Sequence, residues 1–336
     1  MIAAAKLPHA GAGAGRTAVV TGCAGFIGSH LCEALLSEGF RVFGVDNFDD
    51  YYPVALKLRN LEAFARHPGF ALDVFDLADA AKLAAYAARV APDVVVHLAA
   101  VAGVRLSISD PARYVRANLV ATQNVLDVWS RDRAVPLAFA SSSSVYGDGT
   151  PAPFSEDAPC TRPKSPYAAT KRGAELLCEV AHAIHGAPIT ILRFFTVYGP
   201  RQRPDLAIRK FATAMLRNDE LTVYGDGSMA RDFTHVADVV RGVRHAMNER
   251  EGLRTVNLGN SRPCSVRDLV AMLAAATGRT PRVRYVERPP GEMDVTFADA
   301  RAAAERWGWR AEVDFESGLR DFVEWLKREE MAGEGR

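Results

Sequence analysis

Residues Thr17 to Ser29 read TAVVTGCAGFIGS, a short apolar run followed by regularly spaced glycines. The run has the length and β-branched content of a buried strand, and a helical pattern continues from Ser29 to Ser37. Gly22 permits a tight turn, Gly25 lets the backbone approach a pyrophosphate, and Gly28 lets the helix pack close to the strand. The helix amino terminus then faces the phosphates. The stretch therefore predicts a dinucleotide site in the first unit of an α/β fold.

The first half of the chain repeats this alternation of strand and helix. Short runs rich in β-branched residues recur at 42–46, 70–75, 94–98, 137–141 and 189–194. Segments with helical patterns separate them, and such alternation is typical of parallel strands joined by crossover helices. The sequence therefore predicts an α/β fold with a Rossmann-type doubly wound parallel sheet.

The sequence pattern changes after Gly199-Pro200, where closely spaced glycines and prolines indicate shorter helices and strands. We expect this part to form a smaller C-terminal α/β substrate lobe that covers the carboxyl edge of the sheet. The predicted divisions are a flexible leader at 1–15, a nucleotide-binding Rossmann domain at 16–196, a mainly substrate-binding lobe at 197–330 and a frayed tail at 331–336. Segments near 232–258 are expected to return to the Rossmann domain.

The composition argues against several classes of function. The 336 residues carry 41 basic and 40 acidic side chains, so no net field attracts nucleic acid or an anionic membrane. Apolar stretches such as 94–101 are too short to span a bilayer. Five cysteines without a Cys-x-x-Cys pair argue against a disulfide framework and a zinc site, and for a reducing cytoplasm. We therefore expect a cytoplasmic protein that binds no metal, nucleic acid or membrane and holds any anionic ligand with local arginines.

The second and third predicted strands each end in or just before an aspartate. Asp46 can bind both ribose hydroxyls of an adenosine, whereas a 2′-phosphate would meet its negative charge. NAD is therefore favoured over NADP. Asp76 has two readings, because it either faces the adenine amino group or simply caps a helix that starts near Leu77.

Tyr167 and Lys171 lie four residues apart in a predicted helix, downstream of the serine run Ser141 to Ser144. This spacing places both side chains on one face. A phenol ionises near pH 10, so a tyrosine that acts as a base near neutrality needs cationic neighbours. At roughly 6 Å and an effective dielectric of about 20, one positive charge favours the phenolate by about 3 kcal/mol, or about two pKa units. The pair alone fits any amphipathic helix turn, but together with a nucleotide loop and a serine run it indicates a redox site.

The order of these motifs resembles the extended short-chain dehydrogenase/reductase family, and within it the nucleotide-sugar epimerases. The resemblance covers about 16–327. It rests on 21–30 (TGCAGFIGSH), 97–100 (HLAA), Asn118, 141–147 (SSSSVYG), Tyr167 with Lys171, 192–200 (LRFFTVYGP) and 231–233 (RDF). The resemblance implies an NAD-dependent enzyme that acts on a UDP-sugar.

The resemblance also implies roles for single residues. In such enzymes the serine at the position of Ser142 bridges the sugar 4-hydroxyl to the tyrosine, here Tyr167, and the lysine, here Lys171, also holds the nicotinamide ribose. Asn118 is expected to bond backbone near the site, and the roles of His97, Asp232 and His235 are expected to be structural. The implied NAD-binding residues are Gly22, Gly25, Phe26, Ile27, Gly28, Asp46, Asn47, Asp76, Leu77, Leu98, Ala99, Ala100, Asn118, Tyr167 and Lys171.

Three further segments resemble UDP-glucuronate 4-epimerases more narrowly, namely 46–52 (DNFDDYY), 103–105 (GVR) and 201–206 (RQRPDL). A uronate carries a carboxylate at C6, and burying it without a partner is costly. Arg203 is the predicted partner, because guanidinium and carboxylate match as a fork, with help from the hydroxyls of Ser143 and Ser144. The alternative for Arg201 and Arg203 is a solvated loop after a Gly-Pro turn.

The remaining predicted substrate contacts are Arg105, Thr196, Arg231 and Arg288. Many UDP-glucose 4-epimerases carry Asn where Thr196 stands, which weakens the reading of a neutral sugar. Arg231 resembles the family arginine that contacts the diphosphate. Arg288 precedes a segment, 289–292, that normally closes on the nucleotide.

These features lead to the hypothesis of an NAD-dependent 4-epimerisation of UDP-glucuronate to UDP-galacturonate through a transient 4-keto sugar. Epimerisation of UDP-glucose or of UDP-N-acetylhexosamines is the first alternative. Related decarboxylases carry Glu at the position of Ser144, and 4,6-dehydratases carry Asp-Glu at Ser143 and Ser144, so both reactions lack their proton shuttle here. A non-catalytic NAD-binding scaffold is a further alternative, but such proteins typically lose the tyrosine or the lysine. Helices near 111–127 and 167–185 resemble those that pair in dimeric relatives, so a homodimer is expected.

Overall fold

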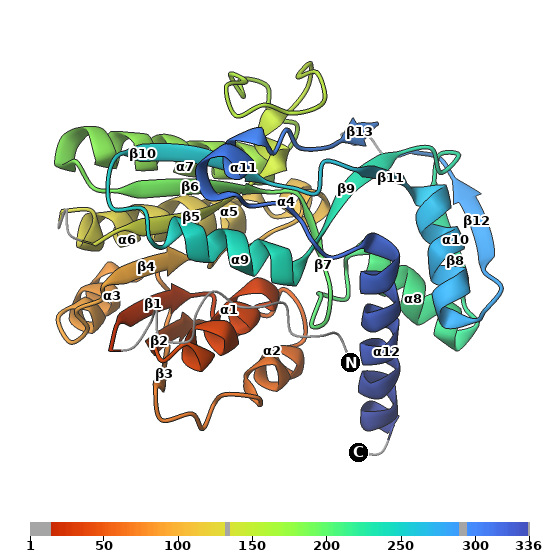
Figure 1. The fold of residues 1–336 in the computed structure, drawn as a ribbon, viewed down its shortest axis with the longest axis horizontal. Helices are drawn as coiled ribbons and strands as arrows, with labels where there is room; N and C mark the ends of the chain where they lie inside the picture. The colour runs from red at the N-terminus through yellow and green to blue at the C-terminus, as the bar shows by residue number, and fades with distance from the viewer. Residues whose placement is uncertain (1–14, 132–134, 289–293, 335–336) are drawn as a thin grey trace.

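The computed structural model describes residues 15–131, 135–288 and 294–334. Its centre is a seven-stranded parallel sheet with helices on both faces (Figure 1). This confirms the predicted doubly wound α/β fold. In their spatial order the strands are β10 (Leu253–Leu258), β6 (Ile189–Phe194), β5 (Leu137–Ser142), β4 (Val94–His97), β1 (Thr17–Thr21), β2 (Arg41–Asp46) and β3 (Phe70–Val74).

Two apolar cores lie on the two faces of the sheet. Val94 and Val96 of β4 belong to the core under α1 (Phe26–Ser37) and α9 (Val236–Ala246). Val95 belongs to the opposite core, because successive side chains of a strand point to opposite faces. That core is closed by α3 (Ala80–Ala87), α6 (Ala121–Trp129) and α7 (Pro166–His185). Burial on both faces explains why these strands are continuously apolar rather than alternating.

The first helix begins at Phe26, three residues before the expected start at Ser29. Gly25 is its extended N-cap, and Gly28 lies inside its first turn. A Cβ atom at Gly28 would lie 2.1 Å from the carbonyl oxygen of Gly22, so only glycine allows the helix this close to the strand. Gly22 itself has a φ of +70°, which favours glycine in the turn. The glycine motif is therefore both the turn and the start of α1.

The order of the strands places the binding crevice. From β1 the chain proceeds through β2 and β3 on one side, then returns to the other side of β1 to form β4. Helices on either side of such a reversal diverge, and ligands of open α/β sheets bind in the crevice outside the carboxyl ends of these strands. The carboxyl ends of β1, β2 and β4 are the positions where the sequence places the glycine motif, Asp46 and Leu98.

The second part of the chain contains smaller sheets. One consists of β11 (Pro263–Ser265), β9 (Ala230–His235) and β13 (Val295–Thr296), with β7 (Thr196–Tyr198) also paired to β9, and the other of β8 (Glu220–Tyr224) and β12 (Arg282–Val286). The helices α8 (Ala207–Arg217), α10 (Val266–Thr277) and α12 (Phe315–Glu334) enclose a third apolar core with these strands. Figure 1 shows β8, β12, α8 and α10 at the end of the molecule away from β1 to β3.

The chain passes between the two parts more than once. After β9, helix α9 packs against α1, and β10 pairs with β6 at the edge of the large sheet. At the carboxyl end, α12 continues to Glu334, where the sequence predicted fraying from 331 onward. The leader predicted at 1–15 lies, apart from Gly15, outside the described residues. Within the described parts of the chain, no helix is both long and apolar enough to cross a membrane.

The remaining elements are short or connect the larger ones. They are α2 (Val54–Leu61), α4 (Val104–Ser109), α5 (Pro111–Tyr114), the π-helical η1 (Val115–Val120), the 3₁₀ turn η2 (Ser143–Tyr146) and α11 (Arg301–Trp307). The region that the sequence predicts as one helix near 111–127 is thus α5, η1 and α6 in succession. A π-helical turn of this kind often marks a functional region.

Candidate active site

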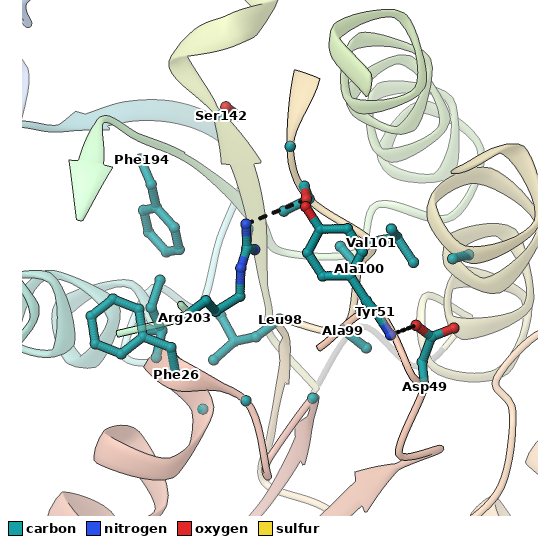
Figure 2. A pocket seen from close by; sticks show the side chains of 18 of the residues that line it. Phe26, Asp49, Tyr51, Leu98, Ala99, Ala100, Val101, Ser142, Phe194 and Arg203 are labelled. Carbon is teal, nitrogen blue, oxygen red and sulfur yellow. Dashed lines mark hydrogen bonds between the residues drawn. The ribbon is translucent and has the colours of Figure 1, made fainter. Parts of the chain in front are cut away.

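A cavity of about 460 Å³ opens at the carboxyl ends of β1, β4 and β5, between the large sheet and the second part of the chain (Figure 2). Most of the segments that the sequence predicts to form the site line this cavity. The described residues around the cavity include Gly22, Gly25, Phe26, Ile27, Gly28, Asp46, Asn47, Asp76, Leu77, Leu98, Ala99, Ala100, Ser142, Ser143, Ser144, Tyr167, Lys171, Thr196 and Arg203. The tertiary structure thus brings together most of the predicted site.

The glycine motif has the shape of a phosphate cradle. The amide of Gly22 donates to the carbonyl of Val45 at 2.7 Å, which ties the turn to β2. A Cβ atom at Gly22 would lie 2.9 Å from the backbone of Ala99, so the loop also touches the end of β4. No acidic residue occupies the first turn of α1, so the positive end of the helix faces the cavity without a competing charge. These residues fit the pyrophosphate of a dinucleotide.

Asp46, which the sequence predicts to bind the ribose, is not an isolated charge. Its carboxylate accepts hydrogen bonds from the amides of Ala24 at 3.2 Å and Phe48 at 2.8 Å. Lys57 of α2 forms an ion pair with it at 3.4 Å, and both side chains are buried. Lys57 also lines the cavity, above the ring of Tyr52. No sequence pattern identifies Lys57, because it stands in an ordinary helical pattern and meets Asp46 only through folding.

The sequence left two alternatives for Asp76, and in the structure it does not cap α3. Asp79 caps α3 by accepting from the amide of Lys82 at 3.1 Å. Asp76 instead accepts from the amide of Ala78 at 2.9 Å and pairs with Arg116 at 2.8 Å. It lines the cavity, so its orientation toward an adenine stays a prediction.

Tyr167 and Lys171 enter the cavity from the first two turns of α7. Ser165 caps this helix by accepting from the amide of Ala168 at 3.1 Å, and Pro166 occupies its first turn. Both Tyr167 and Lys171 are buried. The ammonium of Lys171 donates to the carbonyl of Ala140 in β5 at 2.8 Å.

The electrostatics of this pair differ from the simple expectation. Burial raises the pKa of Tyr167, while a hydrogen bond with Ser142 and the charge of Arg203 act to lower it. Burial lowers the pKa of Lys171 to about 8. The cation that acts most directly on the phenol in the protein alone is therefore Arg203, because Lys171 is engaged with a backbone carbonyl and is itself desolvated. The predicted lowering of the Tyr167 pKa by Lys171 is not what the structure shows.

The serine run divides into two parts. Ser141 donates to the buried carboxylate of Glu175 at 2.6 Å, so its role is structural. Ser142 ends β5 and caps η2 by accepting from the amide of Ser144 at 3.2 Å. Its hydroxyl lies 3.1 Å from that of Ser144. The 3₁₀ turn therefore presents Ser142, Ser143 and Ser144 to the same cavity as Tyr167.

Arg203 reaches the cavity from the loop after β7. Its guanidinium donates to Asp205 and to the carbonyl of Ala102, and Figure 2 shows it beside the ring of Tyr51. Arg201, two residues earlier, points elsewhere and pairs with Glu33 of α1 at 2.8 Å. The two arginines of this loop thus have different environments, and only Arg203 lines the cavity.

Four predicted residues do not line the cavity: Asn118, Arg105, Arg231 and Arg288. Asn118, within η1, accepts from the amide of Val101 at 2.9 Å and donates to its carbonyl at 3.0 Å, which holds the segment after β4. The guanidinium of Arg105 lies 4.4 Å from the ring centre of Tyr224 in β8. The segment 289–292 that follows Arg288 lies outside the described residues.

Three polar residues that look catalytic in isolation have structural contacts. His97 lies 2.7 Å from the hydroxyl of Thr21, and burial lowers its pKa to about 3, so it is neutral. Asp232 accepts from the amides of three loop residues, Asn260, Ser261 and Ala298. His235 caps α9. None of them lines the cavity.

Residues 18–259 match the model of the NAD dependent epimerase/dehydratase family. A UDP-glucuronate 4-epimerase of Thermodesulfobacterium geofontis is 37% identical over 310 residues, which cover 92% of this chain and 95% of that protein.

Solved structures of epimerases are also similar to this chain over most of its length. A UDP-glucuronic acid 4-epimerase from Bacillus cereus, in complex with UDP-glucuronic acid and NAD, has a TM-score of 0.87 and 36% identity, covering 93% of this chain and 99% of that one. A UDP-glucose 4-epimerase from Thermotoga maritima, with UDP-glucose, has a TM-score of 0.85 and 30% identity over the same shares. With the glycine motif, the serine run and the Tyr167–Lys171 pair gathered in one cavity, this chain belongs to the NAD dependent epimerase/dehydratase family.

Proposed function

We propose that this protein interconverts UDP-glucuronate and UDP-galacturonate by NAD-dependent epimerisation at C4. The observation that carries the proposal is the convergence of Ser142, Tyr167 and Arg203 on the cavity that also contains the glycine motif. This arrangement offers a base for the C4 hydroxyl, a cation for the C6 carboxylate and a cradle for the dinucleotide. The similarity to UDP-glucuronate 4-epimerases over more than nine-tenths of the chain supports the same substrate.

In this mechanism Tyr167 takes the proton of the C4 hydroxyl while Ser142 holds that hydroxyl against the phenol oxygen. When bound, NAD⁺ would supply a reversible hydride acceptor for C4, so the reaction has no net redox change. Lys171 holds the nicotinamide ribose, and Arg203 favours the phenolate through its charge. Tyr167 then gives its proton back to the 4-keto oxygen after the sugar has turned.

Arg203, Ser143 and Ser144 would hold the uronate carboxylate. The residues of the serine turn also bear on the competing reaction, which is decarboxylation. A 4-keto uronate is a β-keto acid, and loss of carbon dioxide leaves an enolate that needs a proton at C5. The carboxylates among the described lining residues are Asp46, Asp49 and Asp76, which follow β2 and β3 at the nucleotide end. An acid is thus missing from the serine turn of the described cavity, which favours epimerisation over decarboxylation.

The test is incubation of the purified protein with UDP-glucuronate. UDP-galacturonate of unchanged mass is the expected product, whereas a UDP-pentose with release of carbon dioxide would exclude the proposal. Tyr167→Phe should reduce kcat by about 10²- to 10⁴-fold, the usual contribution of a general base, with NAD still bound. Near-normal turnover in this variant would contradict the role of Tyr167.

The protein is further proposed to act as a homodimer in the cytoplasm. Leu176, Val180 and Ile184 form one exposed stripe on α7, with fractional exposures of 46%, 54% and 66%. Val115 and Val120 of η1 are also exposed, and η1 contacts α7. An apolar face of this kind favours pairing with a second copy. The five cysteines are free thiols, which supports a reducing compartment.

A further inference from the structure

The guanidinium of Arg203 is held by a carboxylate two residues away in the same loop. Its Nε donates to one oxygen of Asp205 at 3.0 Å, and its Nη2 donates to the other at 2.9 Å. This is the side-on fork, in which both bonds lie in one plane. Such a bidentate pair fixes the rotation of the guanidinium as well as its position.

Tyr51, which lies in a different loop, contacts both Arg203 and Asp205. The guanidinium of Arg203 lies over its ring, 4.9 Å from the centre, and its hydroxyl donates to Asp205 at 3.3 Å. A Cβ atom at Gly103 would lie 2.5 Å from this hydroxyl, so the phenol is seated directly against a glycine. Nη2 of Arg203 also donates to the carbonyl of Ala102 at 3.4 Å. Residues of three separate loops therefore hold one side chain.

The arrangement leaves a defined edge of Arg203 for a ligand. Asp205 and Ala102 engage Nε and Nη2, while Nη1 makes no hydrogen bond to the described residues. Arg203 lines the cavity and Asp205 does not. Asp205 thus binds Nε and Nη2 of Arg203 without lining the cavity itself.

The charges explain why geometry matters at this position. Although burial acts to raise the pKa of Asp205, hydrogen bonding and charge attraction from Arg203 lower it overall. Both groups are therefore ionised near neutrality, and the pair has no net charge. Long-range attraction for a ligand carboxylate is correspondingly weak, so recognition depends on hydrogen bonds from a correctly oriented guanidinium.

We propose that Asp205 and Tyr51 are positioning residues that orient Arg203 toward the C6 carboxylate of a UDP-hexuronate and so set the preference for the uronate over the neutral UDP-hexose. This inference rests on the proposed function, because it assumes that Arg203 binds the uronate. It assigns to the loops after β2 and β7 a specificity role that is separate from the chemistry at C4.

The test compares two ligands that differ only at C6, UDP-glucuronate and UDP-glucose. Their dissociation constants are measured by calorimetry on NAD-loaded, full-length protein that carries Tyr167→Phe, so that neither sugar turns over. Asp205→Asn keeps the shape and removes the charge. We expect Asp205→Asn to raise the dissociation constant of UDP-glucuronate about tenfold and that of UDP-glucose less than about twofold. The larger change is that expected for loss of one charged hydrogen-bond partner. Tyr51→Phe, which keeps the ring, should have a smaller effect of the same selectivity.

The chain offers a matched control in Asp299 and Arg301, a second bidentate pair two residues apart that lies outside the cavity. Asp299→Asn should change neither dissociation constant. Equal weakening of both ligands by Asp205→Asn would overturn the proposal, since it would mean that the loop itself is displaced. Tighter binding of UDP-glucuronate would also overturn it, because Asp205 would then be a competitor.

Arg203→Leu separates this inference from the proposed function. If no preference for UDP-glucuronate exists before mutation, the proposed substrate is wrong and the inference falls with it. If the preference exists and Arg203→Leu leaves it unchanged, the proposed substrate stands, but Arg203 is not the partner of the carboxylate and the inference is wrong. If Arg203→Leu abolishes the preference and Asp205→Asn does not, the proposed function stands and the positioning role of Asp205 is wrong.

Discussion

Burial sets the charge states of the two side chains that α7 presents to the cavity. A desolvated phenol resists ionisation and a desolvated ammonium resists protonation, so Tyr167 and Lys171 are both shifted toward their neutral forms. The pKa of the phenol rises above its usual value near 10 while that of the ammonium falls to about 8, so the two pKa values lie farther apart than in water. Transfer of a proton from Tyr167 to Lys171 therefore costs more free energy in this site than it would between the same groups in solvent.

Lys171 makes stability depend on pH in the alkaline range. Its pKa is lowered from 10.5 to about 8 in the folded protein, so between these values the unfolded chain binds more protons at this residue. Stability therefore rises as pH increases through this window. Relative to Lys171→Met, the free energy of unfolding of the wild type should rise by roughly 1 to 2 kcal/mol between about pH 8 and pH 9.5. Urea denaturation of nucleotide-free protein measures this, and a difference that stays constant with pH would contradict it.

The Asp46–Lys57 pair predicts how cofactor choice can be changed. Lys57 offsets part of the charge of Asp46, so discrimination against a 2′-phosphate depends on the carboxylate of Asp46. Asp46→Asn should leave the cation uncompensated and shift the ratio of NADP to NAD affinity toward NADP by about tenfold or more. Lys57→Met should weaken NAD without improving NADP. Fluorescence titrations with NADH and NADPH test both variants, and an unchanged ratio in Asp46→Asn would refute the argument.

Among the elements, α7 carries both the proposed catalytic pair and a buried ion pair that supports the fold. Tyr167, Lys171 and Glu175 follow one another at four-residue steps, so they lie on one face of the helix. Glu175 is wholly buried and binds Arg193 of β6 through two hydrogen bonds, both at 2.9 Å. The ion pair ties the helix to the sheet one turn beyond Lys171. The position of the catalytic turn thus depends on a buried charge pair.

Removal of one partner of this pair should be strongly destabilising. Glu175→Ala leaves Arg193 buried without its counterion, and such losses cost about 3 to 5 kcal/mol of unfolding free energy. Glu179→Ala is the matched control on the same helix, because Glu179 is partly exposed and, among the residues that the structure describes, pairs with Arg172 alone. Its effect should stay within about 1 kcal/mol, as for surface pairs. Similar losses in both variants, measured by urea denaturation, would show that Glu175 is not the structural tie.

At the scale of the whole molecule, α12 and the loop after β7 link the two parts around the cavity. Glu329 of α12 pairs with Arg59 of α2, and the carbonyl of Pro200 lies 2.8 Å from the ring of His30 in α1. Arg201 adds a second contact to α1 through Glu33. The loop that contains Arg203 is therefore anchored to the nucleotide-binding part of the chain. This fixes the proposed sugar and dinucleotide subsites relative to each other.

The proposed dimer is tested on the exposed stripe of α7. Val180→Glu with Ile184→Glu places two charges in the proposed interface, so the protein should become monomeric in light scattering at micromolar concentration. Leu58→Glu provides the control, because Leu58 is an equally exposed apolar residue on α2. A monomeric wild type, or a dimer that tolerates both charges, would exclude this interface.

Local sequence was sufficient for the sheet and for the first contacts with a dinucleotide. The strands 17–21 and 189–194 have the bounds that their β-branched runs predict, because strand formation and glycine turns depend on residues adjacent in the chain. The same holds for Tyr167 and Lys171, whose shared face follows from helical periodicity. The sequence placed α1 three residues late and ended α12 too early, since helix ends depend on local packing that a pattern does not record.

Only the tertiary structure revealed which charges meet. Lys57 reaches Asp46, Tyr51 reaches Asp205 across 154 residues, and Glu175 meets Arg193 under α7. The structure also left Arg105, Arg231 and Arg288 outside the described cavity lining and gave Arg203 a partner of its own. An ion pair between distant segments depends on where packing of the apolar cores places each backbone. Residue types and spacing therefore predicted the chemistry of this protein, and folding decided the orientation and charge state of the groups that carry it.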